Sequence, residues 1–193
     1  MVVTLNGNGV GPVFSYEATD TNGNHSGTPA SNGANRNYDT GLTLDLGNAD
    51  WLVGPDTVTA SLTLTNDTTD GDLDRLTDLT LLDFEITGTD ADMFSLLEAD
   101  GDAFAPSVLS KDESLDLIVQ FEADALLPHG LKEAILTFFT DQGAAFRENG
   151  ADFSFTLNAT QTPEPGSLLV WSLVGAVGLA LGWRRRRNVA QAA

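Results

Sequence analysis

Apolar and polar residues alternate with a period of two through much of the chain from Leu42 onward. Successive side chains of a β-strand point to opposite faces, so this pattern is typical of strands that bury one face. Glycine, asparagine and aspartate separate the alternating segments, as turn residues separate the strands of antiparallel sheets. The pattern predicts an all-β sandwich whose strands lie near residues 42–46, 57–65, 79–87, 115–121, 134–140 and 153–157.

The first 42 residues have a different character, because they are rich in glycine, asparagine, serine and threonine. The stretch 21–37 has almost nothing to bury, which predicts a long loop or partial disorder, with short strands only at 2–5 and 13–18. Short helices are predicted at 91–97 and 122–127. These assignments divide the chain into an N-terminal segment 1–42, a sandwich 43–160, a C-terminal segment 161–187 and a tail 188–193.

Acidic residues are concentrated in the first 162 residues, which hold 27 aspartates and glutamates against five lysines and arginines, a net charge of −22. A field of this sign repels polyanions, so nucleic acid is excluded as a partner of the sandwich. The chain has no cysteine, which excludes disulfides, thiolate zinc sites and cysteine nucleophiles. The charge suits a solvated outer surface or a site for divalent cations.

The segment Gly166–Trp183 contains 18 uncharged residues and is followed directly by four arginines, Arg184, Arg185, Arg186 and Arg187. As a helix this segment spans about 27 Å, close to the hydrocarbon thickness of about 30 Å. Each arginine costs about 2.5–3.5 kcal/mol at the bilayer centre, so a helix in lipid stops at Trp183. We predict a single C-terminal transmembrane helix, with the arginines in the cytoplasm and the acidic sandwich on the opposite side.

A Pro-Glu-Pro motif lies just before this segment, at Pro163, Glu164 and Pro165. The motif, the apolar segment and the arginine stop follow one another within the last 31 residues, and in this order they resemble the PEP-CTERM sorting signal. The resemblance implies that Pro163, Glu164 and Pro165 are recognised by exosortase, a membrane-embedded cysteine peptidase that cleaves near the motif. It also implies export to the surface or the extracellular matrix of a bacterium that makes exopolysaccharide.

Members of the PEP-CTERM family also carry an N-terminal secretory signal. Residues 1–35 contain no basic residue and no long apolar run, so they lack both parts of such a signal. We therefore expect that the true start of the protein lies upstream of Met1; the alternative is export by another route.

The middle of the chain contains a Gly88-Thr89-Asp90-Ala91 turn followed by Phe94, flanked by alternating segments at 62–66, 115–121 and 134–138. Together these residues resemble the immunoglobulin-like domains called choice-of-anchor D, akin to the ASPM/SPD-2/Hydin type. The resemblance implies an immunoglobulin-like β-sandwich in which Phe94 plugs one end and Asp90 caps the turn. It also implies a stalk or adhesion module without catalytic residues.

Residues that carry chemistry are sparse in this sequence. The two histidines, His25 and His129, lie in polar turns without a candidate nucleophile beside them, and no phosphate-binding or zinc-protease motif is present. We therefore predict no enzymatic activity and no required cofactor. The many carboxylates leave an acidic envelope hydrolase open as an alternative.

Oxygen-bearing side chains recur at every second position in two turns, a spacing that suits a hard cation held by a loop. The candidate calcium ligands are Asp70, Asp72 and Asp74 in one turn, and Asp20, Asn22 and Asn24 in the other. Neither turn follows the EF-hand pattern, and a solvated turn without metal is the simpler interpretation.

The sequence predicts a non-enzymatic exported protein of the cell surface or matrix with the membrane as a partner, and the resemblance to the PEP-CTERM signal implies exosortase and exopolysaccharide as further partners. The alternative is a secreted calcium- or carbohydrate-binding adhesion module. Tyr16, Tyr38 and Trp51 are too few and too scattered to indicate an aromatic platform for sugar binding.

Overall fold

The computed structural model describes residues 11–29, 37–50, 56–68, 77–124, 126–142, 150–162 and 170–177. In these ranges the chain forms two five-stranded β-sheets, with one short 3₁₀ helix, η1 (Ala91–Met93). The strands are β1 (Phe14–Asp20), β2 (Gly23–Gly27), β3 (Asn37–Ala49), β4 (Thr57–Asn66), β5 (Leu79–Thr87), β6 (Phe94–Glu98), β7 (Ser107–Leu109), β8 (Ser114–Glu122), β9 (Gly130–Thr140) and β10 (Asp152–Gln161).

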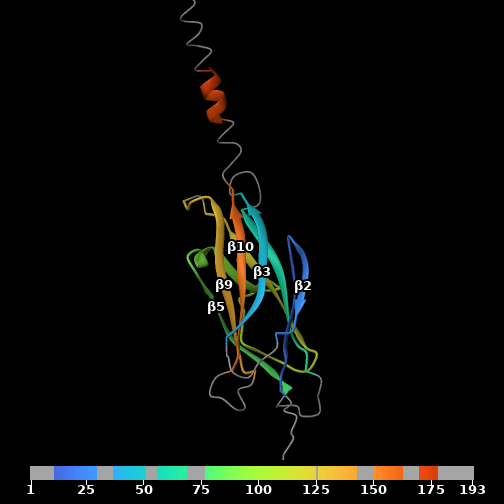
Figure 1. Ribbon diagram of the computed structural model, residues 1–193. Coiled ribbons are helices and arrows are strands. Elements are labelled where there is room, and N and C mark those ends of the chain that lie inside the picture. The colour runs from blue at the N-terminus through green and yellow to red at the C-terminus, as the bar shows by residue number, and fades with distance from the viewer. Residues whose placement is uncertain are drawn as a thin grey trace, which may run out of the picture.

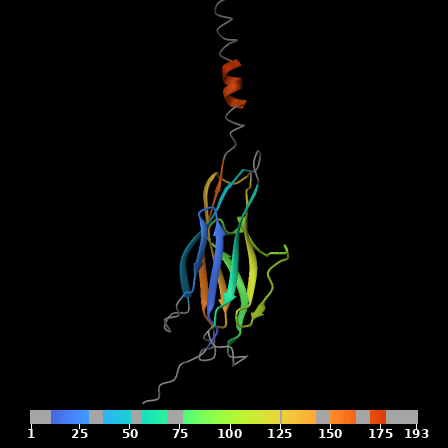
Figure 2. The same ribbon diagram turned by 90° about the vertical axis from the view of Figure 1, so that its right-hand side faces the viewer.

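The two sheets pack face to face, with their strands along the long axis of the domain (Figures 1 and 2). The first sheet has the order β2-β1-β4-β8-β6 and the second the order β3-β10-β9-β5-β7. Neighbouring strands are antiparallel, except that β3 runs parallel to β10. The predicted sandwich of two β-sheets is confirmed, and β5 has the bounds that the alternation predicted.

The core lies between the sheets and is built from the inward-facing half of each strand. In β10 buried and partly exposed residues alternate without a break from Asp152 to Gln161. Phe14 of β1 stacks on Phe153 of β10 with ring centroids 4.1 Å apart, and Tyr16 meets Phe155 edge to face at 5.1 Å. These aromatic pairs join the two sheets, because each pair takes one ring from either sheet.

The stretch 21–37 was predicted to be a loop, but it contains β2, and β3 begins at its last residue. β2 has the sequence GNHSG, with no large apolar side chain, so alternation could not indicate it. It is held by backbone pairing with β1 through the register from Tyr16↔Gly27 to Asp20↔Gly23. The boundary placed at residue 42 falls inside β3, so β1 and β2 are part of the sandwich.

The helix predicted at 91–97 is wrong beyond its first turn. Only η1 is helical, and the chain then continues as β6, which pairs with β8. Phe94 and Leu96 are buried and Ser95 is partly exposed, so this segment has the period of a strand. The second predicted helix, at 122–127, is also not formed: Glu122 ends β8, and the described residues that follow it are not helical.

The edge strands of both sheets are short or irregular. β7 has three residues, and the outer side of β6 is covered by residues 102–103, where Glu98 N–H donates to the Asp102 carbonyl at 2.8 Å. β3 is longer, but its register against β10 shifts twice, at Gly41 (φ 69°) and at Gly47 (φ 94°). Such β-bulges bend a strand and interrupt its row of hydrogen-bonding groups.

Residues 170–177 form a helix whose side chains are all exposed. Within the described ranges, none of the helices combines the length and the apolar character that crossing a membrane requires.

Candidate functional site

Three groups of predicted functional residues lie outside the residues that the structure describes. They are the calcium candidates Asp70, Asp72 and Asp74, the sorting motif Pro163, Glu164 and Pro165, and the membrane stop Trp183, Arg184, Arg185, Arg186 and Arg187. The structure does place the second calcium candidate, the turn after β1, and the surroundings of the point where β10 ends.

The second calcium candidate is a turn organised by the carboxylate of Asp20, whose side chain is fully buried. Asp20 Oδ1 accepts hydrogen bonds from the backbone N–H of Asn22 (2.7 Å) and of Gly23 (3.2 Å), and lies 3.0 Å from Nε2 of His25. Its Oδ2 accepts the backbone N–H of Asp45 on β3 at 2.8 Å. Both oxygens are therefore satisfied by hydrogen-bond donors.

Asn24, another of the three proposed ligands of this turn, accepts a hydrogen bond at Oδ1 from the Thr19 hydroxyl at 2.9 Å. The carboxylate of Asp20 thus faces N–H donors and Asn24 faces a hydroxyl, where a cation would require free oxygen atoms. Among the residues that the structure describes, no group of three or more histidine, aspartate or glutamate side chains is placed to hold a metal ion.

The electrostatics of Asp20 follow from these contacts. Burial on its own would raise the pKa of Asp20, but the hydrogen bonds from the backbone of Asp45, from His25 and from the backbone of Asn22 outweigh it, so the pKa is lowered. Asp20 is therefore a carboxylate at neutral pH and links the β1–β2 turn to the edge of the opposite sheet. Thr21 adds to this link, because its N–H and its hydroxyl both donate to the Asp45 carbonyl, at 3.1 and 2.8 Å.

The Gly-Thr-Asp turn is fixed in a different way from the one expected. Asp90 makes no side-chain capping bond to its own turn. Its Oδ1 instead lies 3.1 Å from Nζ of the buried Lys132, and its Oδ2 accepts the N–H of Glu133 at 3.2 Å, so the turn is bound to β9. Phe94 is buried as expected and packs against Phe121 with ring centroids 5.0 Å apart.

Lys132 was missed by the sequence analysis, although a signal was present. The inward positions of β9 are 134, 136 and 138, and the same period of two extended backward places residue 132 inside. A lysine at a buried position requires an anionic partner, and Asp90 supplies it.

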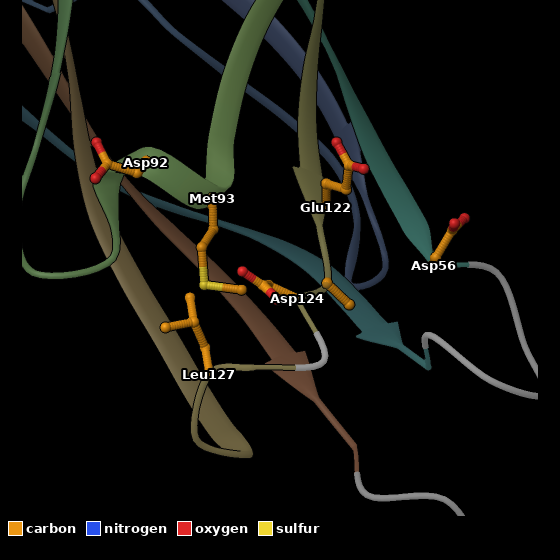
Figure 3. A pocket seen from close by; sticks show the side chains of 7 residues that line it. Asp56, Asp92, Met93, Glu122, Asp124 and Leu127 are labelled. Carbon is orange, nitrogen blue, oxygen red and sulfur yellow. The ribbon is translucent and has the colours of Figure 1, made fainter.

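A pocket of about 590 Å³ lies at the end of the sandwich where β10 finishes (Figure 3). It is lined by the four acidic residues Asp56, Asp92, Glu122 and Asp124, together with Met93, Ala123 and Leu127. The Asp124 N–H donates to Gln161 Oε1 (3.2 Å), and Gln161 Nε2 donates to the Asp124 carbonyl (2.6 Å). These two hydrogen bonds attach the segment after β8 to Gln161, the last residue of β10.

The reactive groups among the described lining residues of this pocket are carboxylates. These described residues include no histidine, serine, threonine or lysine, and so supply neither a nucleophile paired with a base nor a cation that would stabilise an oxyanion. His25 and His129, the two histidines of the chain, are not among those residues either. An acidic lining of this kind attracts cationic groups and repels anionic ones.

The helix at 170–177 exposes a set of large apolar side chains. Their exposed fractions are 61% for Val170, 74% for Trp171, 69% for Leu173, 55% for Val174 and 52% for Val177. The helix therefore does not use the sandwich core to bury these side chains. Apolar surface that is contiguous and exposed marks a site that contacts lipid or another protein.

Comparisons with known proteins place the chain in no family: no family model and no curated protein match it. Among solved structures it resembles the VesB protease of Vibrio cholerae, with 15% identity and a TM-score of 0.37, and covers 30% of that chain with 62% of its own length. It resembles the human CEP192 PapD-like domain 7 at 11% identity and a TM-score of 0.40, with 63% of this chain and 82% of that domain covered.

A third likeness is to the CooA pilin subunit of enterotoxigenic Escherichia coli, with 11% identity and a TM-score of 0.35, covering 77% of this chain and 99% of that one. At these TM-scores the three likenesses assign neither a family nor a function.

Proposed function

We propose that this chain is a non-enzymatic surface or matrix protein of a bacterium, with an immunoglobulin-like sandwich outside the cytoplasmic membrane. Its C-terminal segment anchors the precursor in the membrane and is recognised by exosortase at Pro163, Glu164 and Pro165. The observation that carries this proposal is the exposed apolar helix at 170–177, joined to a sandwich that closes its core without using it.

The exposed helix supports a lipid environment on energetic grounds. The apolar side chains at 170, 171, 173, 174 and 177 each gain about 1.5–3 kcal/mol when they are removed from water. A short helix of this kind is marginal in water, whereas lipid both buries its side chains and favours its internal hydrogen bonds. The four arginines that follow in the sequence fix the orientation, with the sandwich outside.

The position of the motif relative to the sheet supports recognition by a membrane-embedded peptidase. Thr162 is still hydrogen-bonded to the sheet, because its N–H donates to the Ala49 carbonyl at 3.1 Å. The next residue in the sequence is Pro163, which has no N–H and cannot continue such a ladder. The motif thus follows the folded domain directly and immediately precedes the apolar segment, which begins at Gly166.

The character of the sandwich supports a role in adhesion or as a stalk. The described lining of its pocket combines carboxylates with apolar side chains, and two charged groups buried in the sandwich, Asp20 and Lys132, form structural contacts between elements. These groups fasten turns to strands, which is the role expected of a scaffold.

The sorting proposal is tested in a host that contains exosortase. Replacement of Glu164 by Ala is expected to keep the protein at full length and attached to the membrane, whereas the wild type is recovered without its C-terminal segment. Glu85→Ala, an exposed glutamate on β5, removes the same charge from the sandwich and serves as the control. The mass of the protein in the membrane and secreted fractions, and its mass in a strain without exosortase, give the readout. An identical mass and location for wild type and Glu164→Ala would refute the proposal.

A further inference from the structure

The chain enters the sandwich at one end of its long axis and leaves it at the other end. Phe14, the first residue of β1, stacks on Phe153, near the start of β10. β10 then continues to Gln161, and ten residues of strand span about 33 Å. The segment before β1 and the segment after β10 therefore join the sandwich at opposite ends, and both strands lie along its long axis (Figures 1 and 2).

β10 is held on both sides over its full length. It pairs with β9 from Asp152↔Phe139 to Gln161↔Gly130, and with β3 from Asp152↔Asn37 to Gln161↔Ala49. β3 and β10 run in the same direction. When neighbouring parallel strands are pulled in opposite directions along their axes, all the pairs of the ladder resist together.

β1 is linked to β3 by the contacts of the β1–β2 turn. Asp20, the last residue of β1, accepts the Asp45 N–H, and Thr21 donates to the Asp45 carbonyl through both its N–H and its hydroxyl. We call these three hydrogen bonds the Asp45 clamp. Asp45 lies on β3 opposite Asn158 of β10, so the clamp is attached to β3 near the C-terminal end of the β3–β10 ladder.

From this arrangement we infer that the sandwich bears tension along the chain. A pull on the segment before β1 draws β1 toward its own start. The β1–β4 ladder, from Phe14↔Asn66 to Thr19↔Ser61, resists this pull directly, and the Asp45 clamp passes part of the pull to β3. A pull on the segment after Gln161 draws β10 the opposite way. The β3–β10 ladder is then loaded in shear, with all its pairs engaged, rather than opened one pair after another. The source of such a load on a surface protein rests on the proposed function, but the mechanical property does not.

The inference is tested by pulling single molecules of the full chain, in mild detergent, through pairs of engineered cysteines. The chain has no cysteine, so each introduced pair provides the only handles. Gly11→Cys with Thr162→Cys pulls along the strands, and a Cβ at Gly11 meets no atom within 4 Å. Leu131→Cys with Thr162→Cys pulls at one end of the β9–β10 ladder, because Leu131 is 58% exposed and pairs with Thr160.

The expected result is an unfolding force several times higher for the lengthwise pair than for the end pair at the same pulling speed. Forced unfolding is governed by the unfolding barrier, and unzipping meets one ladder pair at a time while shear meets them together. Equal forces for the two pairs, or a lower force for the lengthwise pair, would overturn the inference.

A second arm tests the load path through the Asp45 clamp. Asp20→Ala is expected to lower the lengthwise force and to leave the end-pair force unchanged, because unzipping of β9 from β10 does not load the clamp. Glu17→Ala, an exposed acidic residue on the same strand, is the matched control and should change neither force. If Asp20→Ala lowers both forces in the same proportion, it acts only on overall stability, and the proposed load path is refuted. Neither force measurement depends on exosortase. If the mechanical inference fails, the sorting proposal is unaffected, and if the sorting proposal fails, the mechanical inference is unaffected.

Discussion

Substitution of Asp20 by alanine directly tests the contacts that link the two sheets of the sandwich. Its buried carboxylate satisfies three backbone N–H groups and contacts His25, so Asp20→Ala removes all four contacts at once. The N–H of Asn22 lies at an exposed turn, where water replaces the lost acceptor. The N–H groups of Gly23 and Asp45 are partly buried, and each buried donor left without a partner costs about 1–3 kcal/mol.

Because both donors are only partly buried, the lower part of this range applies to each, and the expected loss in the free energy of unfolding is about 2–4 kcal/mol for Asp20→Ala. For a chain of this size that corresponds to a fall in Tm of about 4–16 °C. Urea denaturation followed by far-UV circular dichroism measures the loss, with Glu17→Ala as the exposed control on the same strand. An unchanged urea slope confirms that stability alone has changed. A loss below about 0.5 kcal/mol, the range of ordinary surface substitutions, would refute the reasoning.

The same residue predicts a dependence on pH. The hydrogen bonds hold the pKa of Asp20 in the folded protein below 3.8, its ordinary value in the unfolded chain. The folded state therefore binds fewer protons than the unfolded state as Asp20 titrates, and this contribution to stability is fully present above pH 3.8. It is lost as the pH falls from 3.8 through the lower folded pKa. The difference in unfolding free energy between wild type and Asp20→Ala should shrink over this range, and a difference that grows on acidification would contradict the argument.

Three further perturbations test other parts of the structure. Phe153→Ala should lower the free energy of unfolding by about 3–5 kcal/mol, because it removes the aromatic ring that stacks between the sheets. Ser154→Ala, on the outer face of the same strand, should cost little. Similar losses for the two variants would contradict the described packing of the core. Asp90→Ala leaves the Lys132 ammonium buried without its partner and should lower the free energy of unfolding by about 3–5 kcal/mol. In a double-mutant cycle, the variant that combines Asp90→Ala with Lys132→Met should recover most of this loss. If it recovers none, the loss does not come from the broken ion pair. Removal of divalent cations with EDTA should leave Tm unchanged, because N–H donors already satisfy the carboxylate of Asp20. A fall in Tm that calcium alone reverses would contradict this expectation.

The alternation of apolar residues was sufficient to predict most strands. β5 was predicted with the correct bounds, and the segments found for β4, β8, β9 and β10 were correct but too short at their ends. The reason is physical: these strands bury one face in the core, so their side chains record the period of two. β2 buries no large apolar side chain and is fixed by its backbone hydrogen bonds to β1, which leave no trace in the residue pattern.

The role of Asp20 could not be read from its neighbours in the sequence. Asp20, Asn22 and Asn24 have the spacing of ligands in a calcium loop, but the same residue types also form tight turns by accepting backbone N–H groups. The contact that decides between the two is with Asp45, 25 residues away and on the other sheet. Local spacing carries no information about such a contact, because the fold itself has to bring β3 beside the turn.

The irregular borders of the two sheets affect how copies of the domain behave together. A long, straight outer strand exposes a row of free backbone groups that can recruit a strand from another molecule, which leads to aggregation. Here β7 has only three residues and β2 only five, β6 is covered by the loop that follows it, and the bulges at Gly41 and Gly47 interrupt β3. Many molecules can therefore crowd side by side at high local concentration, and each one keeps its own strands.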